Sequence, residues 1–587
     1  MEQETYFNDI SRRRVEVICM PFYVSKVVTI GIIRGGKGMK KKKLFACITT
    51  LMLAVSMLAG CGNSSSSNNS NGRNTVSNET VSDDTSFTAK AVSEDAEYKD
   101  ELHVAMGTAP ATLDVMMGTD YIPRIIAYGN IYESLVTLTA DYNWKEELAE
   151  SVEVNDEHTE YIYHLRQGVK FHDETEMTAD DVVASMNRWI EKYSNAKNMV
   201  GDARFEKVDD YTVTIKTEEP ALFLNELIAT QSQGSVIMPA SVIEGADAST
   251  GVSLYIGTGP YKFVEWKDGQ YIKLEKFEDY QPYGTAGETD GWWGYKAAPT
   301  RFVYFDLVTD SSTRVAGISS GEYDFAHELP TDNFGQFGDE SSYQIYKDVL
   351  GCFAVVYNKA EGICSNASFR QAVNAILNPK EILTGAYGSD EFYRIETSYM
   401  GSEMVNWYTT AGEENAHKAD AEAAKKYLEE AGYNGETFRI LVRPSNPDFV
   451  NAAVVIQQEL GAIGVNAEIV SVDNSTYQTY RNDPTQYDIF FTNALPVSVP
   501  TIQIFLSSTW AGFTSDPVIL DGVQEINNCT SLDEAKQKWD TLQGYCWTDS
   551  LPITKLGTSF SYSVSSTEVV DMGYFNGPLV GNAKVIK

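Results

Sequence analysis

Basic residues are scarce in this chain of 587 residues. It holds 46 Lys and Arg against 82 Asp and Glu, which gives a formal net charge of −36 at pH 7. Nucleic acids and anionic membranes both repel a surface of that sign. We therefore expect no nucleic-acid partner, and no membrane binding through the protein surface itself.

Motifs for catalysis and metal binding are also missing. The six histidines include no His-Glu-x-x-His pair, and the chain has no Gly-x-Ser-x-Gly elbow and no nucleotide-binding loop. His164 and His172 lie eight residues apart on a predicted hairpin, which is no standard ligand spacing. Asp180 and Asp181 fit the start of a helix, where negative charge is favourable. We expect no catalytic residue, no metal site and no cofactor, and so no enzyme.

No apolar run is long enough to form a transmembrane helix. The longest, from Leu44 to Met57, is shorter than the roughly twenty residues needed to cross a bilayer. Four lysines precede it and Leu58-Ala-Gly-Cys61 follows, which is the order of a secretory signal. Its ending resembles a bacterial lipobox, in which Cys61 is lipidated and becomes the first residue of the mature chain. The alternative is an ordinary signal peptide in which Cys61 stands by chance.

The regions on either side of this signal have simple compositions. Residues 1–38 fit no targeting pattern, so we interpret them as a mis-annotated upstream extension and residues 39–60 as the signal peptide. Residues 1–60 hold ten basic and four acidic residues, so cleavage before Cys61 leaves a net charge of −42. Residues 61–98 are rich in Ser and Asn without apolar periodicity, which predicts a disordered tether of about 30–36 Å root-mean-square span.

Helices and strands alternate in the rest of the sequence, which is typical of an open α/β sheet. A Thr178 cap with Asp181 three residues later predicts the helix that follows, and Gly432 predicts a helix end. The expected elements are a strand at 101–106, a helix from 125 running into a strand near 138, a hairpin over 152–166, helices at 182–189 and 421–431, and a helix ending near 464 before a strand at 465–470.

Of the seven cysteines, four remain once the signal is removed and Cys61 is lipidated. These four, Cys352, Cys364, Cys529 and Cys546, allow three pairings in an exported protein. Cys529 and Cys546 flank an expected helix that would hold them apart. A Cys352–Cys364 disulfide and four free thiols both stay open.

Seven segments carry a family resemblance, in order, across nearly the whole mature chain. They are "YIYHLRQGVKFHDETEMTADDVVAS" (161–185), "IGTGPYKFVEW" (256–266), "DSSTRVAGISSGEYDFA" (310–326), "VVYNKA" (355–360), "FRQAVNAILNPKEIL" (369–383), "DAEAAKKYLEEAGY" (420–433) and "QYDIFFTN" (486–493). Together they resemble the family 5 solute-binding proteins, the extracytoplasmic receptors of peptide and nickel ABC importers.

The resemblance implies an α/β fold of the periplasmic-binding-protein type II, with two hinged lobes and an extra domain inserted in lobe one. The chain would cross between the lobes near Leu350 and Lys555. The expected boundaries are 99–136, 236–350 and 556–587 for lobe one, 137–235 for the inserted domain, and 351–555 for lobe two.

The implied function is that of a monomeric, lipid-anchored receptor. It would capture an oligopeptide or similar solute and deliver it to an ABC permease and ATPase complex. Its place would be the extracytoplasmic face of a Gram-positive cell membrane, or the periplasmic side in a Gram-negative cell. A receptor for an oligosaccharide, an opine-like compound or a metal chelate is the first alternative, and a secreted hydrolase is an alternative of another class.

Ligand contacts are expected at strand ends and among loop aromatics. Peptide-binding members usually carry an Asp after the segment equivalent to 486–493, and that Asp pairs with the ligand's α-amino group. This chain has no acid between Asp488 and Asp516, so the anchor is missing or is supplied from elsewhere. An oligosaccharide, an opine-like compound or a blocked peptide is therefore a serious rival to a free peptide, which stays the first expectation. The candidate ligand-binding residues are Thr108, Ala109, Tyr132, Trp292, Trp407, Asn493, Ala494 and Trp510.

Overall fold

The computed structural model describes residues 96–118 and 120–587. Contacts divide the chain into residues 1–84 and 85–587, and every described residue belongs to the second unit. The upstream extension, the signal peptide, Cys61 and nearly all of the expected tether lie outside the described residues. Glu97 and Tyr98, at the end of that tether, pair with the C-terminus: the N–H of Lys587 donates to the Glu97 carbonyl at 2.9 Å, and Tyr98 bridges Ile586. None of the described helices has the length and apolar content of a membrane span.

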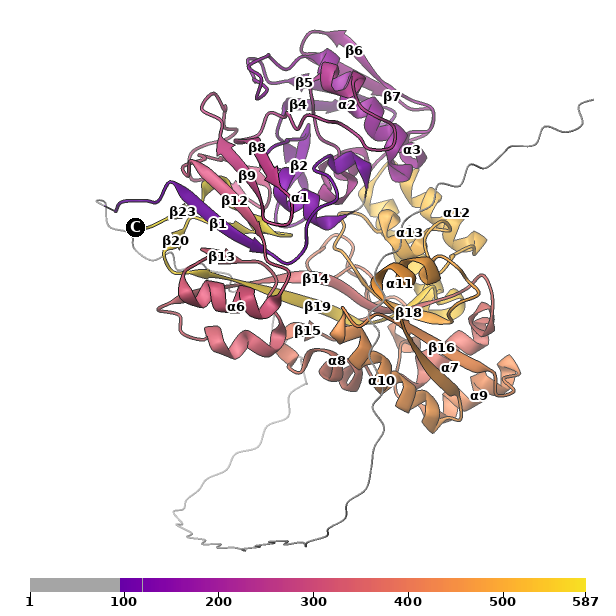
Figure 1. Ribbon diagram of the computed structural model, residues 1–587. Helices are drawn as coiled ribbons and strands as arrows, with labels where there is room; N and C mark the ends of the chain where they lie inside the picture. Colours follow the sequence, from indigo (N-terminus) through magenta and orange to yellow (C-terminus); the bar gives the residue numbers. More distant parts are fainter. Residues whose placement is uncertain (1–95, 119) are drawn as a thin grey trace, which may run out of the picture. The chain divides into compact units, whose positions relative to one another are not determined.

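One mixed sheet of eleven strands organises the described chain (Figure 1). Its strands, in spatial order, are β17 (Asn466–Ser471), β16 (Thr437–Val442), β18 (Ile489–Ala494), β14 (Tyr343–Tyr357), β19 (Ile553–Ser566), β13 (Phe325–Ala326), β1 (Glu101–Met106), β12 (Phe302–Leu307), β9 (Tyr271–Lys276) and β8 (Tyr261–Lys267), with β15 (Tyr393–Arg394) paired to β19.

The two long strands β14 and β19 join the halves of this sheet. They pair antiparallel along most of their length, and Figure 1 shows them side by side between the two halves. The chain passes along β14 from the half with β1, β12 and β13 to the half with β16, β17 and β18, and it returns along β19. The crossings expected near Leu350 and Lys555 fall within these strands. We call the half with β1 lobe one and the half with β16 lobe two.

A separate antiparallel sheet lies in the segment expected as the inserted domain. Its order is β4 (Ala149–Val154), β5 (Glu160–Leu165), β7 (Thr212–Lys216) and β6 (Phe205–Asp209), and α2 (Ala179–Lys192) packs against β6 and β7. α3 (Ser194–Val200) and α4 (Leu224–Ala229) complete this region.

In the described chain, seven α-helices cover the sheet in lobe two, whereas lobe one has three α-helices of at most ten residues. Lobe two has α7 (Ala367–Ile376), α8 (Pro379–Tyr387), α9 (Ala421–Ala431), α10 (Pro447–Ala462), α11 (Asn474–Arg481), α12 (Pro517–Asn527) and α13 (Leu532–Tyr545). Lobe one has α1 (Tyr121–Ala127), α5 (Ala240–Glu244) and α6 (Ser311–Ser320).

Four small two-stranded sheets shape the loops of the described chain. They pair β2 (Val136–Leu138) with β3 (Trp144–Glu146), β10 (Thr289–Asp290) with β11 (Trp293–Gly294), β20 (Val569–Val570) with β23 (Lys584–Val585), and β21 (Gly573–Tyr574) with β22 (Pro578–Leu579).

Local sequence signals set several element ends as expected. Thr178 and Asp181 form the capping box of α2. α9 ends at Gly432, whose φ of 70° gives the left-handed cap that glycine adopts without steric cost. The helix expected from residue 125 differs: α1 ends at Ala127, and Gly129 follows with φ 71°. A Cβ at Gly129 would lie 2.8 Å from the Trp292 ring, so a buried glycine turn replaces the continued helix.

Candidate functional site

A cavity of about 40 Å³ lies where the lobes and the inserted domain meet. Its walls come from both sides of β14 and β19, so a molecule inside touches parts of the chain that are far apart in sequence. The lining residues are Tyr121, Arg124, Leu138, Thr230, Gln231, Ser232, Glu328, Asp348, Val349, Leu350, Leu495, Pro496, Ser561 and Asn576.

The middle of β14 forms one wall, at an irregular point of the strand. The register between β14 and β19 shifts between Val349 and Gly351, and a bulge of this kind re-aims the side chains beside it. Gly351 has φ 141°, and a Cβ there would lie 2.3 Å from the Ala494 carbonyl oxygen. Glycine is therefore required where β14 passes close to the end of β18. Asp348, Val349 and Leu350, directly before it, line the cavity.

The carboxyl group of Asp348 lies in an environment that disfavours its charged form. Burial raises the pKa of Asp348 to about 7, and the negative charge of Glu328 adds to the rise. Backbone N–H groups of Val349, Asn576 and Gly577 oppose this shift, and the Val349 N–H donates to the carboxylate at 2.8 Å. None of the described Lys and Arg side chains forms an ion pair with Asp348. Backbone donors thus orient the carboxylate, but no described Lys or Arg side chain is paired with it.

Glu328 is the second acid of the cavity and follows β13. Its φ of 44° places a non-glycine residue in the left-handed region, a strain that is typical of functional sites. The Tyr121 hydroxyl hydrogen-bonds the carboxylate, and burial and that acid together raise the pKa of Tyr121, so the phenol stays neutral. The ring of His327 lies 3.8 Å away, and burial lowers its pKa, so it brings no charge at neutral pH. Arg314 donates to the Glu328 carbonyl oxygen at 3.3 Å rather than to its carboxylate.

Arg124 supplies the positive charge of the cavity. It lies on α1, is 2% exposed, and donates from one terminal nitrogen to the Gly118 carbonyl oxygen at 3.2 Å. Its Nε is buried and has no hydrogen-bond partner among the described residues. Within 96–118 and 120–587 no carboxylate forms an ion pair with its guanidinium, although two acids line the same cavity.

Neutral polar groups complete the lining. The Nε2 of Gln231, in the short helix Gln231–Gln233, is buried without a partner in the described chain. Asn576 has φ 51°, and its Oδ1 accepts from the Tyr142 hydroxyl at 3.2 Å. A buried donor without a partner is costly, so a ligand or water that accepts from it stabilises the site.

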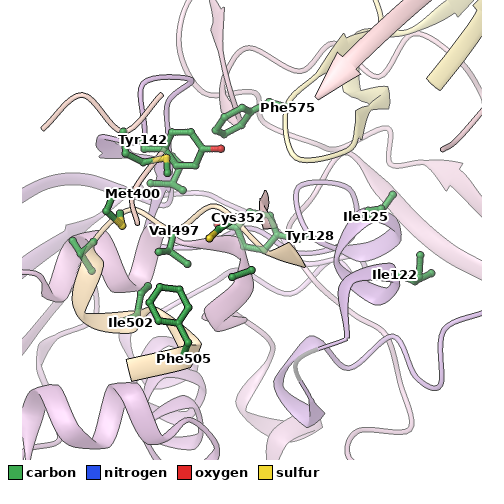
Figure 2. Close-up of a cluster of buried hydrophobic side chains, with 14 of the residues drawn as sticks. Ile122, Ile125, Tyr128, Tyr142, Cys352, Met400, Val497, Ile502, Phe505 and Phe575 are labelled. Atoms are coloured by element: carbon green, nitrogen blue, oxygen red, sulfur yellow. The ribbon is translucent and has the colours of Figure 1, made fainter. Parts of the chain in front are cut away.

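Side chains of lobe two and the inserted domain are in direct contact near this cavity, which Thr230 lines. Thr230 and Ser498 hydroxyls lie 2.5 Å apart, and the Phe223 ring packs edge-on against Trp407 at 5.3 Å. Figure 2 shows a cluster of buried apolar side chains to which lobe one and lobe two both contribute. Its labelled residues are Ile122, Ile125, Tyr128, Tyr142, Cys352, Met400, Val497, Ile502, Phe505 and Phe575.

The residues expected from sequence to bind ligand do not gather in one place. Asn493 and Ala494 end β18 and directly precede Leu495 and Pro496 of the cavity wall, and the Asn493 Oδ1 accepts from Ser559 at 2.8 Å. Trp407 is buried against the inserted domain, where its carbonyl oxygen also accepts from the Trp539 indole at 3.0 Å.

The remaining candidates lie elsewhere. Thr108 and Ala109 line a small hollow of about 10 Å³ in lobe one. Tyr132 is fully buried beside Gly257, and Trp510 packs on Phe490 with ring centroids 5.4 Å apart. Trp292, which is buried against Tyr128, lines another cavity of about 210 Å³. That larger cavity is built from lobe one and the start of the inserted domain, without a residue of lobe two.

Sequence reasoning missed Arg124, Glu328 and Asp348. Each stands in an ordinary local pattern: a short helix, the end of a two-residue strand, and the middle of a long strand. An acid inside a mostly apolar strand was the available signal at Asp348, because burying an unpaired charge there is costly.

The described cysteines and histidines serve structural roles. Cys352, Cys364, Cys529 and Cys546 are buried free thiols, so the Cys352–Cys364 disulfide that the sequence left open is not formed. The Nε2 of His172 lies 3.0 Å from the Gly259 carbonyl oxygen, and burial lowers its pKa to about 4. Across the part of the chain described, no group of three or more His, Cys, Asp or Glu side chains is placed to hold a metal ion.

The sequence matches the model of a known protein family. The model of the bacterial extracellular solute-binding proteins, family 5, matches residues 143–514, which is well over half of the chain. The chain belongs to that family. This family 5 protein therefore belongs to a class of solute-binding proteins rather than to a class of enzymes, as the resemblance implied.

Curated relatives agree with the family assignment. The protein is 26% identical over 486 residues to a probable peptide ABC transporter periplasmic-binding protein, y4tO, of Sinorhizobium fredii, covering 77% of this chain and 87% of the relative. It is 24% identical to the oligopeptide-binding protein AppA of Bacillus subtilis, covering 78% of this chain and 84% of AppA.

Solved structures show the expected type II binding-protein fold. AgaA of A. tumefaciens R10, in complex with agropinic acid, matches with a TM-score of 0.70 at 23% identity and covers 83% of this chain and 99% of its own. AppA of Bacillus subtilis, in complex with a nonapeptide, matches with a TM-score of 0.68 at 20% identity, covering 84% and 100%. The expected fold class is confirmed.

Proposed function

We propose that this protein is the lipid-anchored, substrate-binding component of an ABC importer. It captures a peptide or similar solute in the cavity between its lobes and delivers it to the membrane permease. The observation that carries the proposal is the cavity itself, which Tyr121, Thr230, Asp348, Leu495 and others line from lobe one, the inserted domain and lobe two. A site built across β14 and β19 couples ligand binding to the relative position of the lobes.

The hinge of this receptor lies in β14 and β19. These are the connections through which the chain passes between the halves of the main sheet, so a bend in both strands opens the cavity. The bulges beside Val349 and Phe353 interrupt the regular ladder at this point and mark where the strands bend. Hinge closure around a ligand is the established motion of periplasmic binding proteins.

The membrane anchor follows from the lipobox-like ending at Cys61. Lipid on Cys61 and the tether up to residue 98 keep the receptor close to its permease, which matters because its acidic surface does not bind an anionic membrane. No part of the domain described here is needed for that attachment.

Ligand class separates two forms of the proposal. The relatives y4tO and AppA are named as peptide-binding proteins, which supports a peptide. The absence of an acid between Asp488 and Asp516 and the likeness to the agropinic-acid complex of AgaA support a non-peptide solute such as an opine-like compound.

A thermal-shift screen with native mass spectrometry tests the proposal. A ligand at one hundred times its Kd stabilises the folded state by about 2.7 kcal/mol, which is readily seen as a higher melting temperature. We expect a shift with at least one of three solute panels: small peptides, sugars, and opine or metal-chelate compounds. Absence of a shift and of a bound mass with all three would contradict a receptor role.

A further inference from the structure

The cavity of about 210 Å³ beside Trp292 is separate from the cavity between the lobes. Two hairpins, β10–β11 and β21–β22, form much of its wall, and the turn at Gly129 and Asn130 also lines it. Among the described residues that line it, none belongs to lobe two and none also lines the cavity between the lobes. A molecule held beside Trp292 therefore occupies a site of its own.

Aromatic rings and bare backbone make up most of this wall. The large side chains that line the cavity are those of Trp292, Trp293, Tyr574, Phe575 and Leu579. Five further lining residues are glycines, which place backbone rather than side chains against the space. A wall of this kind suits a flat ring, because the faces and edges of the ring then contact aromatic groups.

The charged groups of the described wall already have partners. The Nζ of Lys296 lies 2.7 Å from the Glu147 carboxylate and 3.5 Å from that of Glu133. Asp571, an acid of the same wall, lies 2.8 Å from the Nζ of Lys584. A charged ligand would lose hydration here without meeting an unpaired charge of opposite sign, which is costly. The cavity therefore favours a neutral ligand.

One buried donor of the wall is left without a partner. Trp292 is 3% exposed, and its indole Nε1 has no hydrogen-bond partner among the described residues. The neighbouring Trp293 differs, because its indole donates to the Glu146 carbonyl oxygen at 3.1 Å. The opposite edge of the Trp292 indole packs so closely on Gly129 that a Cβ there would lie 2.8 Å from Cε3, which fixes the ring in place. A buried donor left unpaired is costly, and a ligand oxygen that accepts from it removes that cost.

We propose that this cavity is a second binding site, for a small neutral molecule with one aromatic ring and one hydrogen-bond acceptor. The ring packs among Trp293, Tyr574 and Phe575, and the acceptor receives the Trp292 indole N–H. An apolar cavity of about 150 Å³ takes up benzene, so about 210 Å³ accommodates a benzene ring with about two or three further heavy atoms. The proposal does not rest on the receptor function, because the site includes no described residue of lobe two.

A matched pair of probes tests the hydrogen bond. Acetophenone has a ring and a carbonyl acceptor, and α-methylstyrene has nearly the same shape with a CH₂ group in place of the oxygen. NMR of ¹⁵N-labelled full-length protein follows the indole N–H signals, and Trp292→Phe identifies the Trp292 signal by its loss. We expect acetophenone to move that signal downfield until it saturates, and to bind at least about 5-fold more tightly than α-methylstyrene. An unmoved Trp292 signal, or equal binding of the two probes, would overturn the proposal.

A cavity-filling variant locates the binding. Leu579→Trp places a larger side chain in the β21–β22 wall and should weaken acetophenone binding by at least about 10-fold. The control Leu254→Trp changes a side chain that is 56% exposed and should leave the affinity unchanged. Equal affinity of Leu579→Trp and the wild type would contradict the proposed location. Circular dichroism reports whether each variant folds, and calorimetry with the two probes tests the proposal on the wild type even if one does not.

Two further probes test the ligand class. Benzoate adds a negative charge to the same ring, and glucose presents many hydroxyl groups without an aromatic ring. We expect neither to move the Trp292 signal, since the described wall offers one unpaired donor and no unpaired charge. Tighter binding of benzoate or glucose than of acetophenone at this site would overturn the assignment. None of these results bears on the receptor function, which the three solute panels test separately.

Discussion

Asp348→Asn should make the ligand-free protein more stable, and should do so more at high pH. The folded-state pKa of Asp348 is about 7, raised by burial from an ordinary value of 3.8. Between these values the folded protein holds a proton that the unfolded chain releases, so the stability contributed by this group falls as pH rises from about 4 to 7 and stays low above it. Asn does not titrate, so the stability of the Asp348→Asn variant does not show this loss as the pH rises.

The size of the effect follows from the same pKa values. At pH 8 the raised pKa corresponds to an unfavourable contribution of about 4 kcal/mol, and at pH 5 to about 1.7 kcal/mol. Water inside the cavity screens the charge, so we expect the advantage of Asn over Asp to grow by about 1–3 kcal/mol between pH 5 and pH 8. Glu328→Gln should reduce this growth only in part, because burial is the main cause of the raised pKa of Asp348 and the charge of Glu328 is a smaller one.

Differential scanning calorimetry of dialysed, ligand-free protein at pH 5 and pH 8 measures this. Melting temperatures of wild type, Asp348→Asn and the exposed control Asp521→Asn are compared, since a chain of several lobes does not give a single free energy of unfolding. The control should change little at either pH. A gain for Asp348→Asn that is the same at both pH values, or a loss, would refute the electrostatic reasoning at this site.

Three further predictions concern the hinge strands and the thiols. Gly351→Ala should lower the free energy of unfolding by more than about 1 kcal/mol, because residue 351 has φ 141° and a Cβ there would meet the Ala494 carbonyl oxygen. The control Gly461→Ala lies in open space within α10 and should raise it by about 0.5–1 kcal/mol. Equal melting temperatures of the two variants would contradict this. Lys555→Met should cost about 3 kcal/mol, because Lys555 is fully buried and lies 2.9 Å from Glu396; thermal unfolding near wild type would contradict it. Thiol labelling in denaturant without reductant should modify all four cysteines of the mature domain, and two unreactive residues would reveal a disulfide.

Much of the fold could be predicted from local sequence. The capping box of α2, the left-handed glycine after α9 and the strand β1 each depend on residues close in sequence, where propensity and hydrogen bonding decide the outcome. The end of α1 could not be predicted this way. Gly129 turns there because the distant Trp292 ring fills the space that a side chain would need.

The site resisted prediction for a related reason. Its charged residues come from α1, the end of β13 and the middle of β14, and only the folded chain brings these three elements to one cavity. The aromatic residues favoured from sequence, Trp407 and Trp292, are buried by packing on Phe223 and Tyr128 instead, because a large aromatic ring contributes as much to a core as to a binding site. The absence of an acid after β18 was visible in the sequence, and its consequence for the ligand stays a prediction.

A crystal structure of the protein with its bound solute tests the central claim most directly. The account predicts density for one small molecule in the cavity lined by Tyr121, Arg124 and Asp348, in contact with both lobes. Density only in the cavity beside Trp292, within lobe one, or a solute held by one lobe alone would contradict it.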